Sequence, residues 1–530
     1  MTPTVLSHAS TWPRSLFAYL PLIWSRVLFP GAGTSDGRVR RLSLAVLIVL
    51  PALVLYPSSS IHLLEPDESR YAQIPREMLA RGDWVVPHLQ SEPYLDKPPL
   101  MYWLVMLSYS VFGVSVAAAR LIPALAIHGT ILASYGFGRK LIGERGAFWG
   151  SLLLSVAPGL MSVGRLLILD GLLALCTTVA MFAAFLAMRG DRLHRGWWLL
   201  AAVAAGAGVL TKGPVILVLT AIPIAMYRLF QGPTCRIGWK AIAVFLAVVF
   251  MVNLPWYVAI GLRKPEFLTY FFWKHNVMRF VAPFDHIKPI WFYLPILAVG
   301  LAPGALLLLW FVRFALSSKP ANSSQRSPEF GFLLLAGGWI VAFFSLSGSK
   351  LPTYILPAFP FLALALGHFV AVRWPLRPRL PAVMIGLTFS ALMFLHHIGL
   401  PRYARMRSPM AEPEKVAKYC ADPNQAVICF PRSCDSVAFY LGRSDLRNVR
   451  SKQSQDLIED CLQRDRTTVL FTHRHSLGAM KLVMPPDLVV TEVVSFRRDR
   501  DAGYFFDWLA GETPWGLCDL AVVERRNKKQ

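Results

Sequence analysis

Residues 42–56, LSLAVLIVLPALVLY, contain no charged side chain and no repeating polar position. A helix at the surface of a soluble domain would carry polar residues along one face, at a period of 3.6. This stretch is apolar all round, so we interpret it as a segment surrounded by lipid. Similar runs follow, among them ILAVGLAPGALLLLWFV at 296–312, and one crossing of a bilayer takes about 20 residues. The sequence therefore predicts a polytopic α-helical membrane protein.

The composition is typical of a membrane protein, and the positions of the basic residues account for the excess of positive charge. The chain has 530 residues, of which 55% are hydrophobic and 16% charged, and its mean hydropathy is +0.46. A net charge of +23 would suit a nucleic-acid-binding protein, but most of the excess lies in short loops between apolar runs. We attribute it to membrane topology and expect no nucleic-acid partner.

Basic clusters predict the orientation, because loops rich in Lys and Arg stay in the cytoplasm. Residues 1–42 become a cytoplasmic or interfacial segment, followed by a transmembrane domain over 43–400. If the apolar run 99–116 crossed the membrane, every later basic loop would lie on the outer side. We therefore predict that this run forms a helix in the membrane interface. Eleven spans remain, at 43–63, 118–138, 146–163, 170–188, 197–210, 214–230, 241–260, 290–312, 329–346, 352–372 and 381–399.

The outer side then receives a long first loop, 64–117, and the C-terminal segment, 401–530. In the latter, strand-like runs such as QAVICF and LVVTEVVSF alternate with helical ones such as SQDLIEDCLQR, which predicts a small soluble α/β domain. This segment holds five of the seven cysteines. In an oxidising compartment one or two disulfides are expected.

Charge gathers in the first loop, in LLEPDESRYAQIPREMLARGDWVVPHLQSEPYLDKPPLMYW at 63–103. Ionisable residues at a membrane face are costly and usually mark a functional site. The adjacent acids Asp67 and Glu68 are suited to a general base or to the start of a helix. Lys97 precedes two prolines that fix the backbone, which suits a phosphate-binding cation, although a lysine reaching to the interface would give the same pattern.

Other loops place further charges on the same side. GRLLILDG carries Asp170, TKGP carries Lys212 between two spans, and SGSKLPTYILP carries Tyr354 close to Lys350. In FFWKHNVMRF, His275 and Arg279 are four residues apart and share one face of a helix. We expect these loops to converge on one site.

Two chemistries fit such a site. Cations beside the bilayer could hold a lipid-linked phosphate while a carboxylate assists transfer of the attached group. Alternatively, the acids and bases could line the path of an ion-coupled transporter. Transporters place their charges near the bilayer midplane, whereas these lie at one face beside long loops, which favours an enzyme.

The blocks PDESRYAQIPREMLARGDWVVPHL, YLDKPPLMYW, RLLILD, LTKGP, WKHNVMRF and SKLPTYILP resemble the bacterial aminoarabinose transferases of the protein-mannosyltransferase superfamily. The similarity runs through about 43–372. It implies a GT-C type glycosyltransferase fold, with thirteen spans where we predict eleven. It also implies a bacterial inner-membrane location, with the active site and the C-terminal domain in the periplasm.

The resemblance also implies a reaction, namely inverting transfer of a sugar, 4-amino-4-deoxy-L-arabinose in this family, from undecaprenyl phosphate to lipid A. Asp67 and Asp170 match the family's two important acids, and Tyr94, Lys97, Arg279 and Tyr354 match positions associated with the donor phosphate. Glu68, Lys212 and His275 join them as candidates. Asp96 stands where the family usually has Glu, and with His275 it offers only two ligands, so no metal site is assigned.

The sequence is compatible with two kinds of acceptor. A phosphate acceptor is already anionic, so Asp67 would orient it or stabilise a cationic sugar, whereas a hydroxyl acceptor needs a base. Another polyprenyl-linked sugar, passed to lipid or protein, is the alternative within the class.

Overall fold

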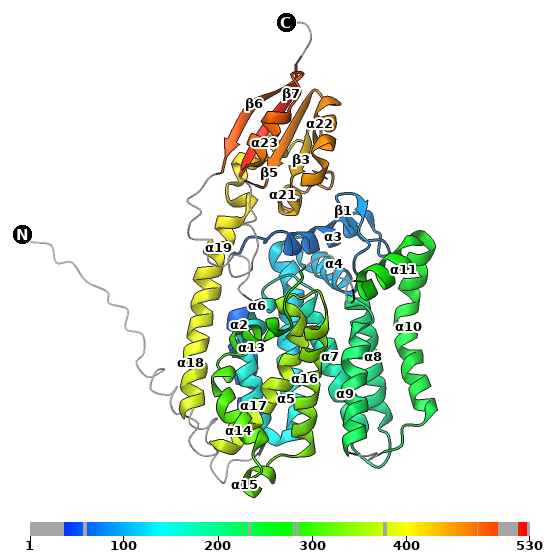
Figure 1. Cartoon of the computed structure of the whole chain (residues 1–530), viewed down its shortest axis with the longest axis vertical. Helices are drawn as coiled ribbons and strands as arrows, with labels where there is room; N and C mark the ends of the chain where they lie inside the picture. Colours follow the sequence, from blue (N-terminus) through cyan, green and yellow to red (C-terminus); the bar gives the residue numbers. More distant parts are fainter. Residues whose placement is uncertain are drawn as a thin grey trace, which may run out of the picture.

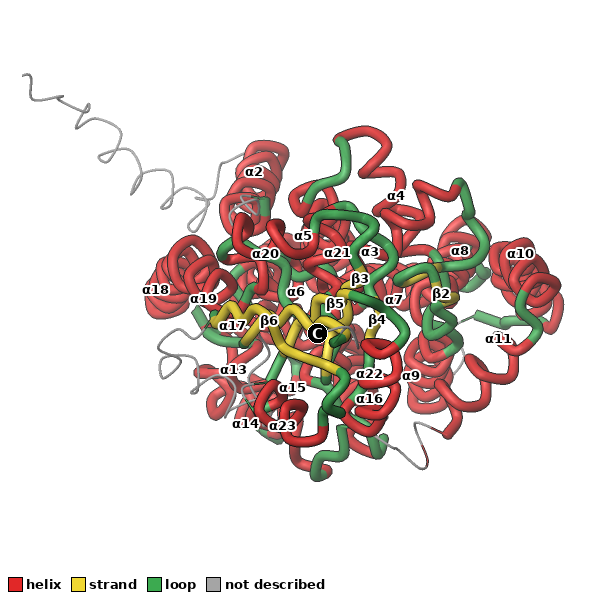
Figure 2. Tube along the Cα trace, turned by 90° about the horizontal axis from the view of Figure 1, so that it is seen from above, coloured by secondary structure: helices red, strands yellow, loops and turns green. Residues whose placement is uncertain are grey.

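The computed structural model describes residues 36–56, 61–231, 235–278, 281, 286–374, 379–473, 475–496 and 518–526, without the side chains of 36, 231, 275–277 and 406–407. A bundle of long helices lies below, a sheet domain lies above, and a layer of short elements separates them (Figure 1). Viewed from above, the sheet lies over the middle of the bundle (Figure 2).

The bundle begins with α2 (Asp36–Leu55) and continues after the first loop. Its further helices are α5 (Val116–Ser155), α6 (Pro158–Gly164), α7 (Asp170–Ala187), α8 (Arg195–Lys212), α9 (Val215–Gln231), α10 (Trp239–Arg263), α13 (Tyr293–Gly300), α14 (Leu308–Leu316), α16 (Pro328–Leu346), α17 (Phe359–Arg373) and α18 (Arg379–Phe394). Short 3₁₀ helices, η2 (Ile290–Phe292), η3 (Gly304–Leu307) and η4 (Pro352–Ala358), precede α13, α14 and α17. The helix α15 (Pro320–Ser323) is a single turn between α14 and α16.

Among the described residues, six helical segments are long and apolar enough to cross a membrane, and a bent pair would make seven. The chain is therefore a multi-span membrane protein, as predicted. The remaining predicted spans coincide with helices that are shorter or more polar. For example, α9 has only 17 residues, and α2 has three arginines among its first six residues.

The predicted span 118–138 lies within α5, and the predicted span 146–163 begins in α5 and ends in α6. Helix α5 is interrupted at Gly143, where φ is 74°. The chain folds back at this residue and brings Gly138 close to Ala147: a Cβ built on Gly138 would lie 3.2 Å from the Cβ of Ala147. The prediction for 290–312 was wrong as a single straight span. The two helical pieces Ile290–Gly300 and Gly304–Leu316 meet at 104°.

Close backbone contact holds α5 against α17. A Cβ on Gly367 would lie 2.1 Å from the backbone nitrogen of Gly150, and one on Gly150 would lie 2.7 Å from Cα of Leu364. Glycines allow such approach because they carry no side chain, which is how helices in lipid gain van der Waals contact. Stacked rings fill the neighbouring core, including Phe185 on Phe332, with centroids 4.2 Å apart.

The layer above the bundle consists of the first loop and the residues after α10. The loop holds α3 (Asp67–Arg81), a two-stranded hairpin of β1 (His88–Leu89) and β2 (Glu92–Pro93), and α4 (Leu100–Phe112). The second part holds α11 (Glu266–Thr269) and η1 (Tyr270–Met278). The 13 residues of α4 are too few to cross a bilayer, in agreement with the interfacial helix predicted at 99–116.

The last membrane helix continues through η5 (Leu395–Gly399) into α19 (Leu400–Arg407), and the sheet domain follows. Its strands, in the order β4-β3-β5-β7-β6, are β4 (Arg447–Asn448), β3 (Ala426–Phe430), β5 (Arg466–Phe471), β7 (Asp519–Arg525) and β6 (Leu488–Ser495). Its helices are η6 (Pro409–Ala411), α20 (Pro413–Cys420), α21 (Asp435–Leu441), η7 (Ser451–Gln453), α22 (Ser454–Leu462) and α23 (Ser476–Val483). The first three strands run parallel and β7 is antiparallel to both neighbours.

This confirms the predicted α/β unit, but not the predicted disulfides. Cys429 on β3 and Cys461 on α22 belong to different apolar clusters. No disulfide joins the cysteines at 420, 429, 434 and 461, which are buried thiols. The prediction took the cysteine count as its guide, whereas the fold uses these side chains as small apolar core residues.

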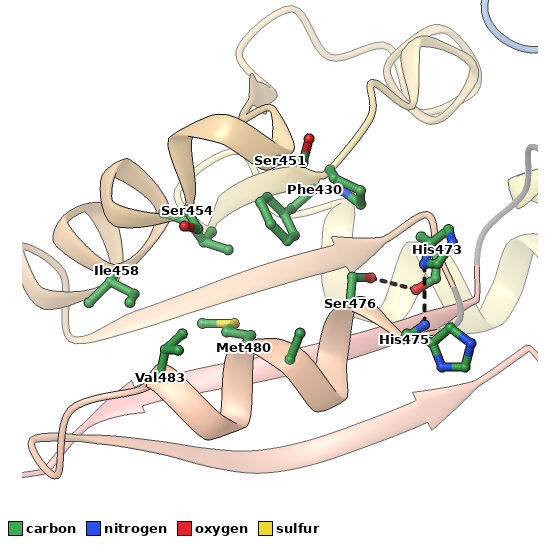
Figure 3. Close-up of a pocket in the computed structure, with 12 residues that line it drawn as sticks. Phe430, Ser451, Ser454, Ile458, His473, His475, Ser476, Met480 and Val483 are labelled. Atoms are coloured by element: carbon green, nitrogen blue, oxygen red, sulfur yellow. Dashed lines mark hydrogen bonds between the residues drawn. The ribbon is translucent and has the colours of Figure 1, made fainter.

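Between α22 and α23 the domain has a mainly apolar hollow of ≈ 370 Å³, at the carboxyl ends of β3 and β5 (Figure 3). Phe430 and Met480 line it, and His473 and Ser476 lie where β5 gives way to α23. The Ser476 hydroxyl donates to the carbonyl oxygen of His473 at 2.5 Å.

Candidate functional site

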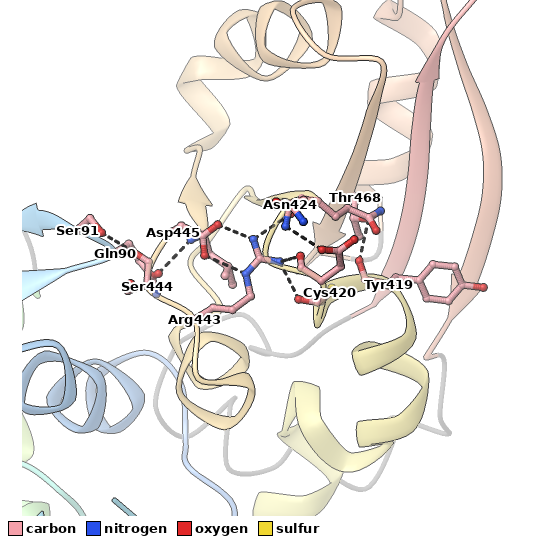
Figure 4. Close-up of polar contacts among 12 residues, drawn as sticks. Gln90, Ser91, Tyr419, Cys420, Asn424, Arg443, Ser444, Asp445 and Thr468 are labelled. Atoms are coloured by element: carbon pink, nitrogen blue, oxygen red, sulfur yellow. Dashed lines mark hydrogen bonds and ion pairs between the residues drawn. The ribbon is translucent and has the colours of Figure 1, made fainter. Parts of the chain in front are cut away.

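The sheet domain is joined to the first loop by polar contacts centred on Arg443 (Figure 4). Its guanidinium donates to the carbonyls of Cys420 and Asp422, each at 2.8 Å, and pairs with Asp445 at 2.5 Å. The carbonyl oxygen of Arg443 accepts a hydrogen bond from Gln73 of α3 at 2.7 Å. Helix α3, which begins with Asp67, is therefore held from above by the C-terminal domain.

The adjacent acids Asp67 and Glu68 have opposite surroundings. The Asp67 side chain is 55% exposed, and its carboxylate lies 3.5 Å from a guanidinium nitrogen of Arg70. Glu68 is buried, and both of its oxygens face Arg120, at 2.5 and 2.6 Å. Only Asp67 is accessible to a substrate.

Glu68 is saturated by further contacts. It accepts hydrogen bonds from the backbone N–H groups of Leu64 and Leu167, at 3.0 and 3.1 Å. Arg120 also donates to the carbonyls of Ile61 and His62. A carboxylate with its acceptor positions filled has no capacity left for proton transfer. In place of the chemical role expected from the sequence, we assign Glu68 a structural role.

The Glu68–Arg120 pair holds together the segments that carry Asp67 and Asp170. It joins the start of α3, the start of α5 and the loop 165–169, and that loop ends at Asp170. Arg165, fully buried, secures the same loop by donating to the carbonyl of Val54 at 2.8 Å. Sequence analysis missed Arg120, although an arginine inside an apolar segment is itself a signal of a buried partner.

Asp170, Lys212 and Tyr354 come together from three segments, as expected. Lys212 Nζ lies 2.7 Å from Asp170 and 4.4 Å from the centre of the Tyr354 ring. Asp170 stands in the first turn of α7, where the helix dipole favours a carboxylate. Both charged side chains are partly exposed, at 17% for Lys212 and 11% for Asp170, so the pair remains open to a substrate.

Tyr94, Asp96 and Lys97 form the second group, next to Asp67. Arg70 lies over the Tyr94 ring at 5.7 Å, and Asp96 accepts a hydrogen bond from Tyr270 at 3.0 Å. Burial raises the pKa of Tyr94 well above its usual value, so this phenol stays neutral and can donate a hydrogen bond. Lys97 is half-buried beside them.

Some candidates are not placed. Arg279 and the side chain of His275 lie outside the described residues. Within the described part, no group of three or more His, Cys, Asp or Glu side chains is arranged to hold a metal ion. Lys350 donates to the carbonyl of Lys288 at 3.0 Å and is buried, which suits a structural role.

A second pair of acids, not foreseen from the sequence, lies where α21 contacts the loop. Glu65 accepts hydrogen bonds from Ser69 and, at 2.7 Å, from the backbone N–H of Ser436. Enclosure of this carboxyl group, with Asp435 nearby, raises the pKa of Glu65 to about 8. Burial likewise raises the pKa of Asp435.

Comparison with known proteins identifies related chains. Residues 39–271 match the family described as dolichyl-phosphate-mannose-protein mannosyltransferase. The undecaprenyl phosphate-alpha-4-amino-4-deoxy-L-arabinose arabinosyl transferase 1 of Sodalis glossinidius is 39% identical over 345 residues, which are 62% of this chain and 58% of that protein. The corresponding transferase of Pseudomonas paraeruginosa is 34% identical over 70% of this chain and 66% of its own length. The chain thus spans less than two thirds of these relatives.

Two solved structures have a similar fold. ArnT from Cupriavidus metallidurans bound to undecaprenyl phosphate matches with a TM-score of 0.69 and 20% identity, over 92% of this chain and 98% of that chain. The Archaeoglobus fulgidus oligosaccharyltransferase matches with a TM-score of 0.50 and 15% identity, over 78% of this chain and 65% of that chain. The chain belongs to the aminoarabinose transferase-like glycosyltransferases of the protein-mannosyltransferase superfamily, which have the GT-C fold.

Proposed function

We propose that the protein transfers a sugar, 4-amino-4-deoxy-L-arabinose, from undecaprenyl phosphate to lipid A or a related acceptor. The observation that carries the proposal is the contrast between the adjacent acids, with Glu68 closed by Arg120 and Asp67 accessible next to Arg70. The relatives named above act on this donor, and one solved relative is bound to undecaprenyl phosphate. We further propose that this end of the bundle faces the periplasm of a bacterial inner membrane, since the basic loops lie at the other end.

Transfer breaks the bond between the sugar's anomeric carbon and the carrier phosphate and forms one to the acceptor oxygen. The bonding electrons leave with the phosphate, whose negative charge grows in the transition state. Cations at the site, Lys97 and Lys212, with Arg279 proposed beside them, would stabilise that charge. The Tyr94 phenol would donate a hydrogen bond to the same phosphate.

Asp67 and Asp170 have different surroundings and so different proposed roles. Asp67 is exposed and would face the acceptor or the cationic sugar; with a phosphate acceptor no base is needed, and with a hydroxyl acceptor it would take the proton. Asp170 is bound to Lys212 and would orient that cation on the donor. Inversion follows if the acceptor attacks the face opposite the leaving phosphate.

The test uses purified protein in detergent with synthetic undecaprenyl-phosphate-linked aminoarabinose and lipid A, where vectorial transport is impossible. Mass spectrometry should find lipid A heavier by one sugar. Asp67→Asn and Lys97→Ala should each lower the rate at least about 100-fold while the protein stays folded. Full activity in either variant would reject its role. Absence of product with lipid A, but transfer of another sugar or to another acceptor, would favour the alternative within the class. No transfer at all would favour a transporter.

A further inference from the structure

The side of the bundle formed by α7, α8, α9 and α10 contains a hollow of ≈ 710 Å³, within the range of about 300–1,000 Å³ typical of ligand sites. Four alanines leave the space, since they repeat at i and i+4 on α7 and again on α9: Ala180, Ala184, Ala221 and Ala225. Larger side chains of the neighbouring helices form its edges, among them Trp198 of α8 and Phe245 of α10.

The hollow opens towards the surroundings of the bundle. Ile242 and Leu246, which line it from α10, are 49% and 54% exposed. Figure 2 shows α10 at the rim of the molecule, and on the inner side it is joined to α8, where Trp198 donates to the carbonyl of Ala241 at 2.8 Å. A rim helix that faces lipid and leaves an apolar hollow beside it admits acyl chains.

One charged residue lines the hollow. Arg228 lies in the last turn of α9, at the end of the bundle opposite the C-terminal domain. Among the described residues no carboxylate pairs with it, and its guanidinium lies 4.0 Å from the sulfur of Met188. Arg189, which follows Met188 in the chain, is by contrast paired with Glu329 at 2.9 Å. An unpaired guanidinium at the mouth of an apolar hollow is suited to an anionic headgroup.

Arg195 precedes the lining residue Trp198 by three positions on α8, and residues at this spacing share one side of a helix. Basic pockets between membrane helices on the cytoplasmic side bind the headgroups of anionic lipids. We infer that this hollow is a binding site for an anionic phospholipid of the cytoplasmic leaflet, with its phosphate on Arg228 and its acyl chains along the alanines. The leaflet follows from the orientation under "Proposed function", whereas the site itself does not depend on the transfer reaction.

A lipid in this position would support α10 from the side that lacks protein contacts. The opposite end of α10 contacts the first loop, where Arg263 pairs with Asp83 at 2.7 Å and Trp256 donates to the carbonyl of Val85 at 2.9 Å. The lipid would therefore raise the thermal stability of the protein.

The experiment uses the full chain, delipidated in detergent, with phosphatidylglycerol, phosphatidylethanolamine and undecaprenyl phosphate added separately. Native mass spectrometry should show phosphatidylglycerol retained at least about tenfold better than phosphatidylethanolamine, and only the former should raise the Tm. Arg228→Ala should abolish this preference, whereas Arg313→Ala, at the same end of the bundle on α14, should keep it.

Filling the hollow separates a lipid site from general charge attraction. Ala225→Phe should prevent retention of phosphatidylglycerol although Arg228 remains, and Leu387→Phe on the exposed face of α18 should not. Equal retention of the two phospholipids, or unchanged preference in Arg228→Ala, would overturn the inference. Displacement of phosphatidylglycerol by undecaprenyl phosphate would also overturn it, because the hollow would then hold the carrier's tail. None of these outcomes depends on transferase activity.

Discussion

Two ion pairs at the same end of the bundle differ in what surrounds them. The Glu68–Arg120 pair has side chains that are 3% and 0% exposed, and every neighbour is protein. The Asp67–Arg70 pair, one residue along, is 55% and 25% exposed. The first joins three segments of the chain, and the second leaves a carboxylate facing outwards. The Asp170–Lys212 pair is intermediate in exposure, at 11% and 17%. Burial and a full set of hydrogen bonds therefore distinguish a structural acid from an acid that can take part in a reaction.

The largest change in stability is expected where the buried pair is broken. Glu68→Gln should cost about 3–5 kcal/mol, because Arg120 would remain buried without its counter-charge. Thermal unfolding in detergent measures the loss, and activity should disappear with the fold. Replacing both partners, as in Glu68→Leu with Arg120→Met, should restore much of the stability, since an apolar pair carries no unpaired charge. A stable, active Glu68→Gln protein would show that the comparison is wrong.

A smaller change in stability is expected at the intermediate pair. Asp170→Asn should cost about 1–3 kcal/mol, the usual value for a hydrogen bond to a charged group. Transfer should fall at least about tenfold, because Lys212 would lose the partner that orients it. Steady-state kinetics with the polyprenyl donor check this effect, and Glu329→Gln, which breaks the Arg189 pair at the far end, serves as the matched control. Equal loss of rate in both variants would mean that the Asp170 effect is not specific to the site.

The acids between the loop and the C-terminal domain predict a pH dependence. Glu65 has a pKa of about 8 in the folded protein against a usual value of 4.5, so the folded state binds more protons between these values. The contribution of Glu65 to stability is fully present below about pH 4.5 and is lost as pH rises through about 8. Asp435, whose pKa is also raised by burial, acts in the same direction, and the charge of Arg70 opposes the rise for Asp435.

Glu65→Gln mimics the protonated form and tests this sign. The variant should match the natural protein at about pH 5 and should have a higher Tm at about pH 9, by an amount on the order of a few kcal/mol. Limited proteolysis between α19 and β3 should report the same change as release of the C-terminal domain. A variant with the same pH profile as the natural protein would assign the dependence to other groups.

The smallest change in stability is expected at the exposed pair. Arg70→Gln should alter the free energy of unfolding by less than about 1 kcal/mol through loss of its ion pair with Asp67. The rate of transfer should fall nonetheless, because Arg70 also lies over Tyr94. Chemical unfolding and single-turnover kinetics on the same preparation separate the two effects. A large loss of stability would place this pair with the structural one.

The sequence predicts more about segments than about partners. Apolar runs and basic loops were enough to predict a multi-span protein, and strand-like runs predicted β3 and β6, because these patterns are local. The bend at 301–303 was missed, since hydropathy is averaged over a window and does not register a change of direction. The motif residues Asp170, Lys212 and Tyr354 were predicted to converge, and they do so from segments that are far apart along the chain.

By itself, the sequence determined that the chain crosses a membrane, that its charged loops lie at one end and that an α/β unit follows, because residue type fixes how each segment interacts with lipid or water. The tertiary structure is needed to show which of the two adjacent acids is accessible. Asp67 and Glu68 are of the same chemical kind, and the sequence set Asp67 apart through its match to an important acid of the family, without showing what closes Glu68. Arg120 lies 52 residues after Glu68, and the fold alone brings it within 2.5 Å of that carboxylate. An ion pair depends on distance in space, which the fold sets and the sequence pattern does not show.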